Sequence, residues 1–178
     1  MKIGIDISQT AYEKTGVANY VQKLIEHLIL IDKTNEYILF FSSLRKTVPS
    51  FAKSLSVNNP RVQLKIRKIP PTMLDVFWNK LHIMPIEDII GEVDIFISSD
   101  WTQPPTKRAK RATILYDLII YRYPEETHTK IVYTQRRRLN WIKKECDIIF
   151  CISESTKQDA KDILGINDER LKVIYPGI

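Results

Sequence analysis

The sequence has little cysteine and little histidine, and neither residue type is arranged as a site. Two of its 178 residues are cysteines, Cys146 and Cys151, and they lack the CxxC spacing of metal and redox motifs. Both are therefore interpreted as small, reduced core residues rather than as a disulfide. The three histidines stand apart and form no ligand-like cluster. No metal site is expected.

Long hydrophobic runs and a glycine-rich fingerprint are also missing. No run approaches the roughly 18 apolar residues that a membrane span needs. The N-terminal "MKIGIDI" has the pattern of a strand and not of a signal peptide, so the expected location is the cytoplasm. Only Gly16 lies in the first strand-to-helix loop, where a dinucleotide-binding domain needs GxGxxG. The NAD fingerprint is therefore absent.

Acidic residues are outnumbered by basic ones. The net charge is +6, which favours an anionic partner such as nucleic acid, an anionic lipid surface or a phosphorylated substrate. The basic residues are dispersed over several elements and no nucleic-acid motif is present, so no nucleic-acid partner is expected. The run Arg136, Arg137 and Arg138, with Lys143 and Lys144, is interpreted as a solvated face, with a membrane-facing role as the alternative.

Strand patterns alternate with helix patterns along the whole chain. The apolar pattern predicts strands at 2–7, 36–42, 61–69, 93–99, 112–118, 147–153 and 170–176, and helices at 17–31, 73–83, 128–145 and 155–164. This order is typical of the α/β class, with a Rossmann-like, mainly parallel sheet and helices on both faces. No repeat or linker interrupts it, so residues 1–178 are expected to form a single domain.

The predicted helix at 73–83 has two interpretations. Its apolar residues, among them Phe77, Trp78 and Leu81, form a stripe that ordinarily packs on a sheet. The same residues could instead form an exposed ridge that meets a lipid-linked acceptor or the membrane surface, with lysines and arginines nearby for anionic headgroups.

Ligands of a parallel sheet bind beyond the carboxyl ends of its strands, which directs attention to four loops. In the first, Thr15 and Gly16 immediately precede a helix, so the backbone there could face a phosphate without a side chain in the way. The alternative is that Gly16 only permits a turn. Tyr12 and Asn19 in the same stretch are candidate acceptor-binding residues.

The second loop offers Asp100 and Trp101, an acid and an aromatic side by side that suit a sugar acceptor. Trp101 could equally pack under the turn at Pro104 and Pro105. The third loop offers Tyr116, whose hydroxyl donates or accepts a hydrogen bond, and Asp117, which could contact a ligand or simply cap the next turn.

The fourth loop precedes the helix at 155–164. Ser153 or Ser155 can cap that helix, and Ser155 with Gln158 matches the spacing of a capping box. The same helix start is a second candidate anion site, with Ser153 as a phosphate contact.

Taken together, these segments resemble the N-terminal half of family-four glycosyltransferases. "IGIDIS" and "TGVANYVQKLIEHLILIDKTNEYILF" look like the family's first strand, glycine loop, first helix and "D-x-x-N-x-Y-x-L-F" strand. "YDLIIYRYPE" looks like its "HDL…PE" segment. "CDIIFCISESTKQDAKDILGINDERLKVIYPGI" resembles its most characteristic passage, and the four motifs occur in the family's order.

The resemblance implies a retaining enzyme of the GT-B fold, with the active site in a cleft between two domains. The N-terminal domain would bind the acceptor, and a C-terminal domain that holds the nucleotide-sugar donor is expected to follow "YPGI". Gly16 would approach the donor diphosphate. Helix dipoles and cationic side chains would replace a metal ion, so no cofactor is expected. This half alone is expected to transfer no sugar.

The chain departs from the family pattern at two positions. Thr15 stands where the family often has a second glycine, and Tyr116 stands where it commonly has the histidine of "HDL". Because tyrosine has a pKa near 10, it is a poor general base at neutral pH, so Tyr116 is expected to position a hydroxyl rather than to transfer protons. The alternative to a transferase domain is a stand-alone, non-catalytic Rossmann-like binding module.

Overall fold

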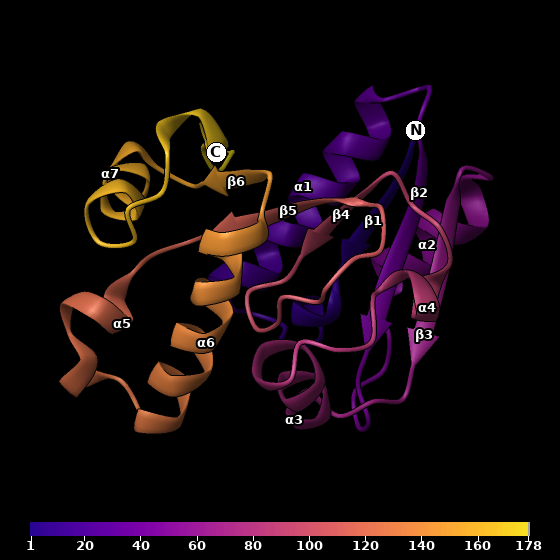
Figure 1. The fold of residues 1–178 in the computed structure, drawn as a ribbon. Coiled ribbons are helices and arrows are strands. Elements are labelled where there is room, and N and C mark those ends of the chain that lie inside the picture. The colour runs from indigo at the N-terminus through magenta and orange to yellow at the C-terminus, as the bar shows by residue number, and fades with distance from the viewer. Residues whose placement is uncertain (178) are drawn as a thin grey trace.

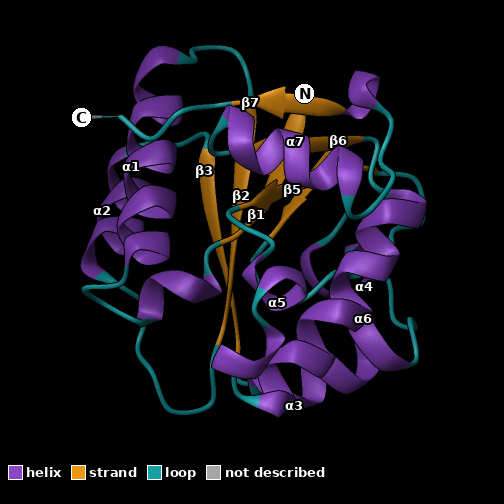
Figure 2. Ribbon diagram, turned by 90° about the vertical axis from the view of Figure 1, so that its left-hand side faces the viewer, coloured by secondary structure: helices purple, strands orange, loops and turns teal. Residues whose placement is uncertain are grey.

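A computed structural model describes residues 1–177, and it consists of one seven-stranded, entirely parallel sheet with helices on both sides (Figures 1 and 2). The strands occur in the order β3-β2-β1-β4-β5-β6-β7. Their bounds are β1 Lys2–Asp6, β2 Glu36–Ser42, β3 Val62–Arg67, β4 Ile95–Ser98, β5 Lys110–Leu115, β6 Ile148–Cys151 and β7 Leu171–Val173. The α/β, Rossmann-like fold predicted from the sequence is confirmed.

The helices connect successive strands. The main ones are α1 Gly16–Ile31, α2 Ser50–Asn58, α3 Pro71–Leu74, α4 Glu87–Ile90, α5 Ile119–Arg122, α6 Thr129–Glu145 and α7 Glu154–Asp162. Short 3₁₀ turns occur at Ser8–Ala11, Pro124–Glu126 and Asp168–Arg170, and a π-helical segment, Asp75–Lys80, continues α3. The last residue of the "YPGI" motif, Ile178, lies outside the described residues.

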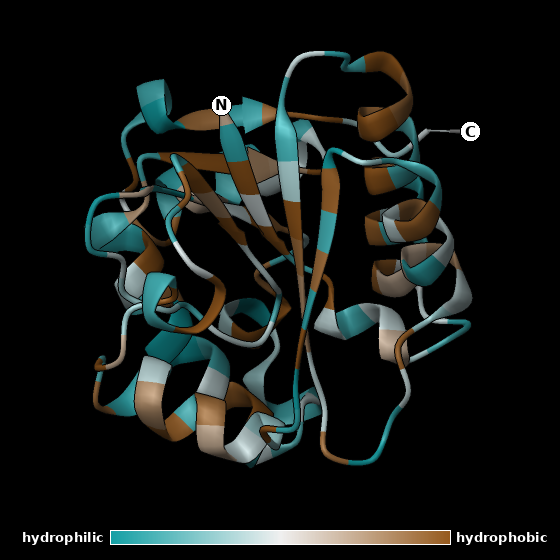
Figure 3. Cartoon of the chain, turned by 90° about the vertical axis from the view of Figure 1, so that its right-hand side faces the viewer, coloured by the Kyte–Doolittle hydropathy of each residue, from teal (hydrophilic) through white to brown (hydrophobic). Residues whose placement is uncertain are grey.

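Alternation along β2 divides the core between the two faces of the sheet. Tyr37, Leu39 and Phe41 pack with α1 and α2, whereas Ile38 and Phe40 pack with α3, α4 and the π-helical segment. In Figure 2, α1 and α2 lie on one side of the sheet and α3, α4 and α6 on the other. Figure 3 shows hydrophobic and hydrophilic residues alternating along the helices, which each bury one face.

Several elements differ from the predictions at their ends. β5 ends at Leu115, so Tyr116 and Asp117 follow the strand instead of closing it. α7 begins at Glu154 with Ser153 as its N-cap, so the capping box centred on Ser155 is wrong. α2 was not predicted, because its sequence buries only Ala52 and shows little amphipathic pattern.

The helix predicted at 73–83 begins two residues earlier and contains the π-helical segment. Leu74 and Trp78 are buried in the core, and the Trp78 Nε1 atom donates a hydrogen bond to the carbonyl of Met84 at 3.0 Å. The core-packing interpretation therefore holds for these two residues, and Trp78 is no part of an exposed ridge. Leu81 is exposed. No helix within residues 1–177 is long and apolar enough to cross a membrane.

The "D-x-x-N-x-Y" part of the family motif lies at the opposite edge of the sheet from the four loops. The Asp32 carboxylate accepts hydrogen bonds from the backbone of Thr34 and Asn35, from the Asn35 side chain and from the Tyr37 hydroxyl. These bonds hold the pKa of Asp32 well below its usual range, with the Tyr37 hydroxyl as the largest cause. The motif thus fixes the turn between α1 and β2.

Candidate functional site

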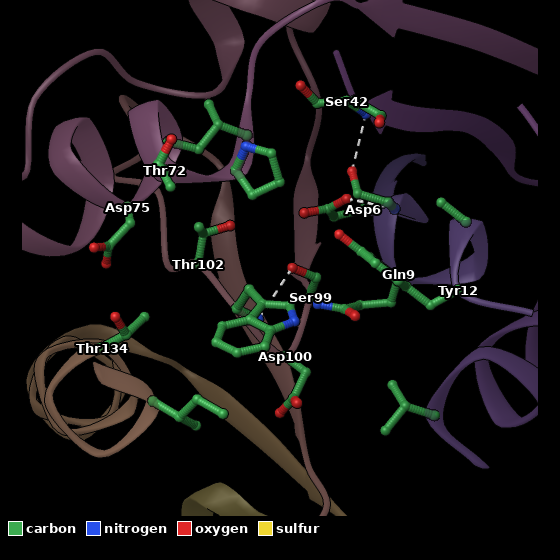
Figure 4. A pocket seen from close by; sticks show the side chains of 18 of the residues that line it. Asp6, Gln9, Tyr12, Ser42, Thr72, Asp75, Ser99, Asp100, Thr102 and Thr134 are labelled. Carbon is green, nitrogen blue, oxygen red and sulfur yellow. Dashed lines mark hydrogen bonds between the residues drawn. The ribbon is translucent and has the colours of Figure 1, made fainter. Parts of the chain in front are cut away.

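A cavity of about 530 Å³ lies where β1, β2 and β4 end, between the loops that follow them and the start of α6 (Figure 4). Its lining combines hydroxyl, carboxylate and apolar groups. The residues are Asp6, Ser8, Gln9, Ala11, Tyr12, Thr15, Val17, Ser42, Ser43, Pro71, Thr72, Leu74, Asp75, Ser99, Asp100, Trp101, Thr102, Lys130, Ile131 and Thr134. This is the edge of a parallel sheet at which ligands bind.

Asp6, the last residue of β1, is a site residue that the sequence analysis missed. Its carboxylate accepts a hydrogen bond from the Ser8 backbone at 2.8 Å, and the side chain is buried beside the cavity. Burial raises the pKa of Asp6 above its usual range, and the hydrogen bonds from Ser8 and Ser99 oppose that shift. A polar residue at the end of an apolar strand, the signal that pointed to Asp117, was present at Asp6 as well.

Asp100 lies in the cavity lining next to a buried guanidinium. The Asp100 Oδ1 atom is 3.5 Å from Nη1 of Arg138. The side chain of Arg138 is only 1% exposed to solvent. Burial raises the pKa of Asp100 to about 6, while Arg138 lowers it and Asp117 raises it further. A carboxyl group with such a pKa exchanges its proton close to neutrality.

Arg138 is tied to the surrounding backbone and side chains. It donates hydrogen bonds to the carbonyls of Ser99 and Ile114, to Thr113 Oγ1 at 3.0 Å and to Gln135 Oε1 at 3.2 Å. Gln135 in turn donates to the carbonyl of Asp100 at 2.7 Å. The loop that carries Asp100 is therefore held from behind by α6.

The prediction that the arginine run is a solvated face is wrong for Arg138. Arg136 is exposed and lies 5.4 Å from the ring centre of Tyr121, whereas Arg137 pairs with Asp75 at 2.8 Å. Arg138 lies on the buried stripe of α6 with Gln135 and Ile142, at helical spacing. That spacing was the signal in the sequence that could have identified it.

Trp101 is one of the residues that line the cavity, and it is partly exposed. Its backbone carbonyl accepts a hydrogen bond from the Asn79 side chain at 2.8 Å, and the same side chain accepts one from the Gln103 backbone. Asn79 belongs to the π-helical segment and is buried. It thereby fixes the loop that carries Trp101.

The first loop contributes Tyr12 and Thr15 to the cavity lining. Tyr12 is 46% exposed, and Thr15 caps α1 by accepting a hydrogen bond from the Ala18 backbone at 3.2 Å. Gly16 is exposed, its φ is not positive, and a Cβ atom added there would meet nothing within 4 Å. The fold itself therefore does not require a glycine at this position. Asn19 is exposed on α1, outside the lining.

The third and fourth loops meet each other beside the cavity without lining it. The Tyr116 ring contacts that of Tyr20 edge-on, with centroids 5.6 Å apart. Thr156 donates a hydrogen bond to the Tyr116 carbonyl at 3.0 Å, and Ser153 caps α7 through the Thr156 backbone. Burial, followed by Asp100 and Tyr20, raises the pKa of Tyr116, so its hydroxyl is neutral at physiological pH.

Asp117 takes the capping role that was the alternative to ligand contact. Its carboxylate accepts a hydrogen bond from the Ile119 backbone at 3.1 Å, and the side chain is exposed.

Of the nine candidate residues, the structure brings four to the cavity lining: Tyr12, Thr15, Asp100 and Trp101. Five lie outside it: Gly16, Asn19, Tyr116, Asp117 and Ser153.

Within residues 1–177 no three histidine, cysteine, aspartate or glutamate side chains are grouped as metal ligands. Both cysteines are buried and free, and burial raises the pKa of the Cys151 thiol to about 11.

A comparison with models of protein families identifies the family of the chain. The model of the family described as "Glycosyltransferase Family 4" matches residues 15–178, which include α1, the cavity loops after β2 and β4 and the segment from β6 onward, but not the loop after β1 that precedes residue 15. A search of curated proteins found no match. Because the match spans most of the chain, the protein belongs to glycosyltransferase family 4.

Proposed function

We propose that residues 1–178 form the N-terminal, acceptor-binding domain of a retaining glycosyltransferase of the GT-B fold. The enzyme would transfer a sugar from a nucleotide-sugar donor to a saccharide or lipid-linked saccharide. One observation carries the proposal: in a family-four chain, an indole ring and three carboxylates line a single cavity at the carboxyl ends of the strands. The carboxylates are those of Asp6, Asp75 and Asp100.

Each of these groups has chemistry that suits a sugar. An indole face packs against the apolar face of a pyranose ring, while carboxylates accept hydrogen bonds from its hydroxyls. With a pKa of about 6, Asp100 is mainly ionised at neutral pH and able to accept a proton from an acceptor hydroxyl. Arg138 holds it in place. We assign acceptor contacts to Tyr12, Asn19, Asp100 and Trp101.

The donor phosphates are proposed to lie against the start of α1, near Thr15 and Gly16, with Ser153 at the start of α7 as a further contact. The open space around Gly16 supports this placement, because the fold makes no use of the missing Cβ atom. Helix N-termini stabilise negative charge, and no metal ion is required. Tyr116, neutral and beside Asp100, would position a substrate hydroxyl, with Asp117 fixing its turn.

Most of the nucleotide-sugar would be held by a second domain, so these residues alone are not expected to transfer sugar. We further propose a cytoplasmic enzyme with peripheral membrane contact. Met73, Val76, Leu81 and Ile83 are each at least 40% exposed. They follow Pro71 and Thr72, which line the cavity, so the segment that carries these exposed apolar side chains is joined directly to the acceptor site.

A transfer assay with the full-length enzyme tests the proposal. Labelled nucleotide sugars are offered with saccharide and lipid-linked acceptors, and Trp101→Ala is compared with Leu30→Ala, an exposed apolar residue on α1. Loss of an aromatic stacking partner predicts a KM for acceptor raised about tenfold, with little effect of Leu30→Ala.

Gly16→Ala tests the donor side of the site. It is expected to lower turnover without lowering the melting temperature, since the added methyl group meets no protein atom.

The alternative function is a non-catalytic binding module. Saccharide binding that depends on Trp101, without transfer from any donor by the complete protein, would establish that alternative and end the catalytic assignment.

A further inference from the structure

A second groove, distinct in its chemistry from the cavity, lies beside it between the loop after β1 and the loop after β2. Its volume is about 750 Å³. Three lysines from three segments line it: Lys14 before α1, Lys46 in the loop after β2, and Lys53 on α2. Lys46 and Lys53 lie outside the four predicted loops, and none of the three lysines is among the proposed donor contacts.

The three ammonium groups are not paired with a carboxylate in the part of the chain that the structure describes. Among residues 1–177, none of them forms an ion pair, although lysines elsewhere do, such as Lys107 with Asp88 and Lys157 with Asp168 at 3.1 Å. Glu13 is the one acidic residue in the groove lining. Like charges gathered in a concave surface repel one another, and a bound anion relieves that repulsion.

Hydroxyl groups accompany the lysines. Thr15, Thr47 and Ser50 line the same groove, and hydroxyl donors with ammonium groups are a combination that binds phosphate oxygens. The charge of the groove lining is thus opposite to that of the cavity lining. The cavity is lined by three aspartates and one cationic residue, Lys130.

The two sites are adjacent. Ala11, Tyr12 and Thr15 line both of them, so these residues form the boundary that a ligand occupying both sites would cross. An uncharged, hydroxyl-rich part suits the aspartate-lined cavity, and an anionic end suits the lysine groove.

We propose that this groove binds a phosphate group carried by the acceptor, with Lys14, Lys46 and Lys53 as its counter-charges. The inference rests on the proposed acceptor function and narrows the acceptor to a phosphorylated saccharide or a saccharide phospholipid. Such a substrate places its sugar against Trp101 and its phosphate among the lysines.

The test measures phosphate binding directly and does not depend on transfer activity. Inorganic phosphate is titrated into the ¹⁵N-labelled chain at constant ionic strength, with chloride as the balancing anion, and amide shifts are recorded. We expect saturable shifts at Lys14, Lys46, Thr47 and Ser50. The triple variant Lys14→Gln, Lys46→Gln, Lys53→Gln is expected to weaken binding about tenfold, because each exposed charge pair contributes modestly.

A matched triple variant removes the same charge elsewhere. Lys33→Gln, Lys110→Gln, Lys172→Gln changes three exposed lysines outside the groove and is expected to leave binding unchanged. Equal weakening by both triple variants, or shifts that do not saturate, would show a nonspecific response to charge and overturn the proposal. Saturable shifts at Gly16 that survive the groove variant would assign the phosphate to the donor loop and also overturn it.

A second binding experiment, with phosphatidylglycerol vesicles, distinguishes binding of an acceptor phosphate from binding of a membrane surface. If phosphate gives no saturable shifts but phosphatidylglycerol vesicles bind the chain through these lysines, the groove is a membrane contact and the acceptor assignment fails. Absence of transfer by the full-length protein would contradict the proposed function alone, since the phosphate titration is read without it.

Discussion

Replacing Arg138 with alanine removes the guanidinium that holds α6 against the ends of β4 and β5. The side chain is 1% exposed and donates hydrogen bonds to two backbone carbonyls, Thr113, Gln135 and Asp100. Its loss leaves these acceptors without a donor and the Asp100 carboxylate without its nearest positive charge. Breaking a buried charge pair on one side costs about 3 to 5 kcal/mol of unfolding free energy.

For a domain of this size, such a loss lowers the melting temperature by about 6 to 20 °C. Thermal and urea unfolding, followed by circular dichroism, measure it. Arg136→Ala is the matched control, because Arg136 is exposed on the same helix and contacts only the Tyr121 ring in a cation–π interaction. We expect it to cost about 0.5 to 1 kcal/mol.

Arg138→Lys adds a second measurement. Lysine keeps a positive charge but cannot reproduce the forked donor geometry of arginine. The unfolding free energy of the Arg138→Lys variant should therefore fall between those of the wild type and Arg138→Ala. If Arg138→Ala proves as stable as Arg136→Ala, the buried network does not stabilise the fold, and the account of how Asp100 is held is wrong.

Three further predictions concern packing, protonation and membrane contact. Gly4→Ala should destabilise the protein by about 1 to 3 kcal/mol, because its Cβ atom would lie 2.8 Å from the Phe96 ring, whereas Gly16→Ala should not destabilise it in the same urea titration. Asp100 has a higher pKa in the folded than in the unfolded state, so its contribution to stability is present at low pH and lost as pH rises from about 4 to about 6. Asp100→Asn should therefore gain stability relative to wild type across that window, and a pH-independent difference would refute the assignment. Met73→Ser, Val76→Ser, Leu81→Ser should reduce co-sedimentation with anionic vesicles about tenfold, while the exposed control set Leu30→Ser, Ile31→Ser, Val57→Ser should not; equal effects would exclude this membrane contact.

Local patterns predicted the strands and the long helices well and the short helices poorly. The helical stripe from Val17 to Ile31 became α1, and "EYILFFS" became β2 with the predicted bounds. α2 escaped prediction because a nine-residue helix with one buried residue has almost no amphipathic signal. The π-helical segment was missed because its hydrogen-bonding pattern depends on the packing of Trp78 and Asn79, which no sequence period reports.

The lining of the cavity was predicted in part. The rule that ligands bind at the carboxyl ends of parallel strands led to Asp100 and Trp101, which line the cavity. The same rule led to Asp117 and Ser153, which cap turns and helices outside it. Asp6 was overlooked, although it ends a strand in the same way. The sequence could not distinguish a strand-end acid that lines a cavity from one that caps a turn.

The sequence by itself determined the alternation of strands and helices and the family, because these depend on residues close together in the chain. Only the tertiary structure decided which polar residues share a site. Arg136 and Arg138 are nearly adjacent and chemically identical, yet one is exposed and the other buried, since successive residues rotate by about 100° around a helix axis. The cavity joins loops that are far apart in sequence because the order of strands places β1 beside both β2 and β4.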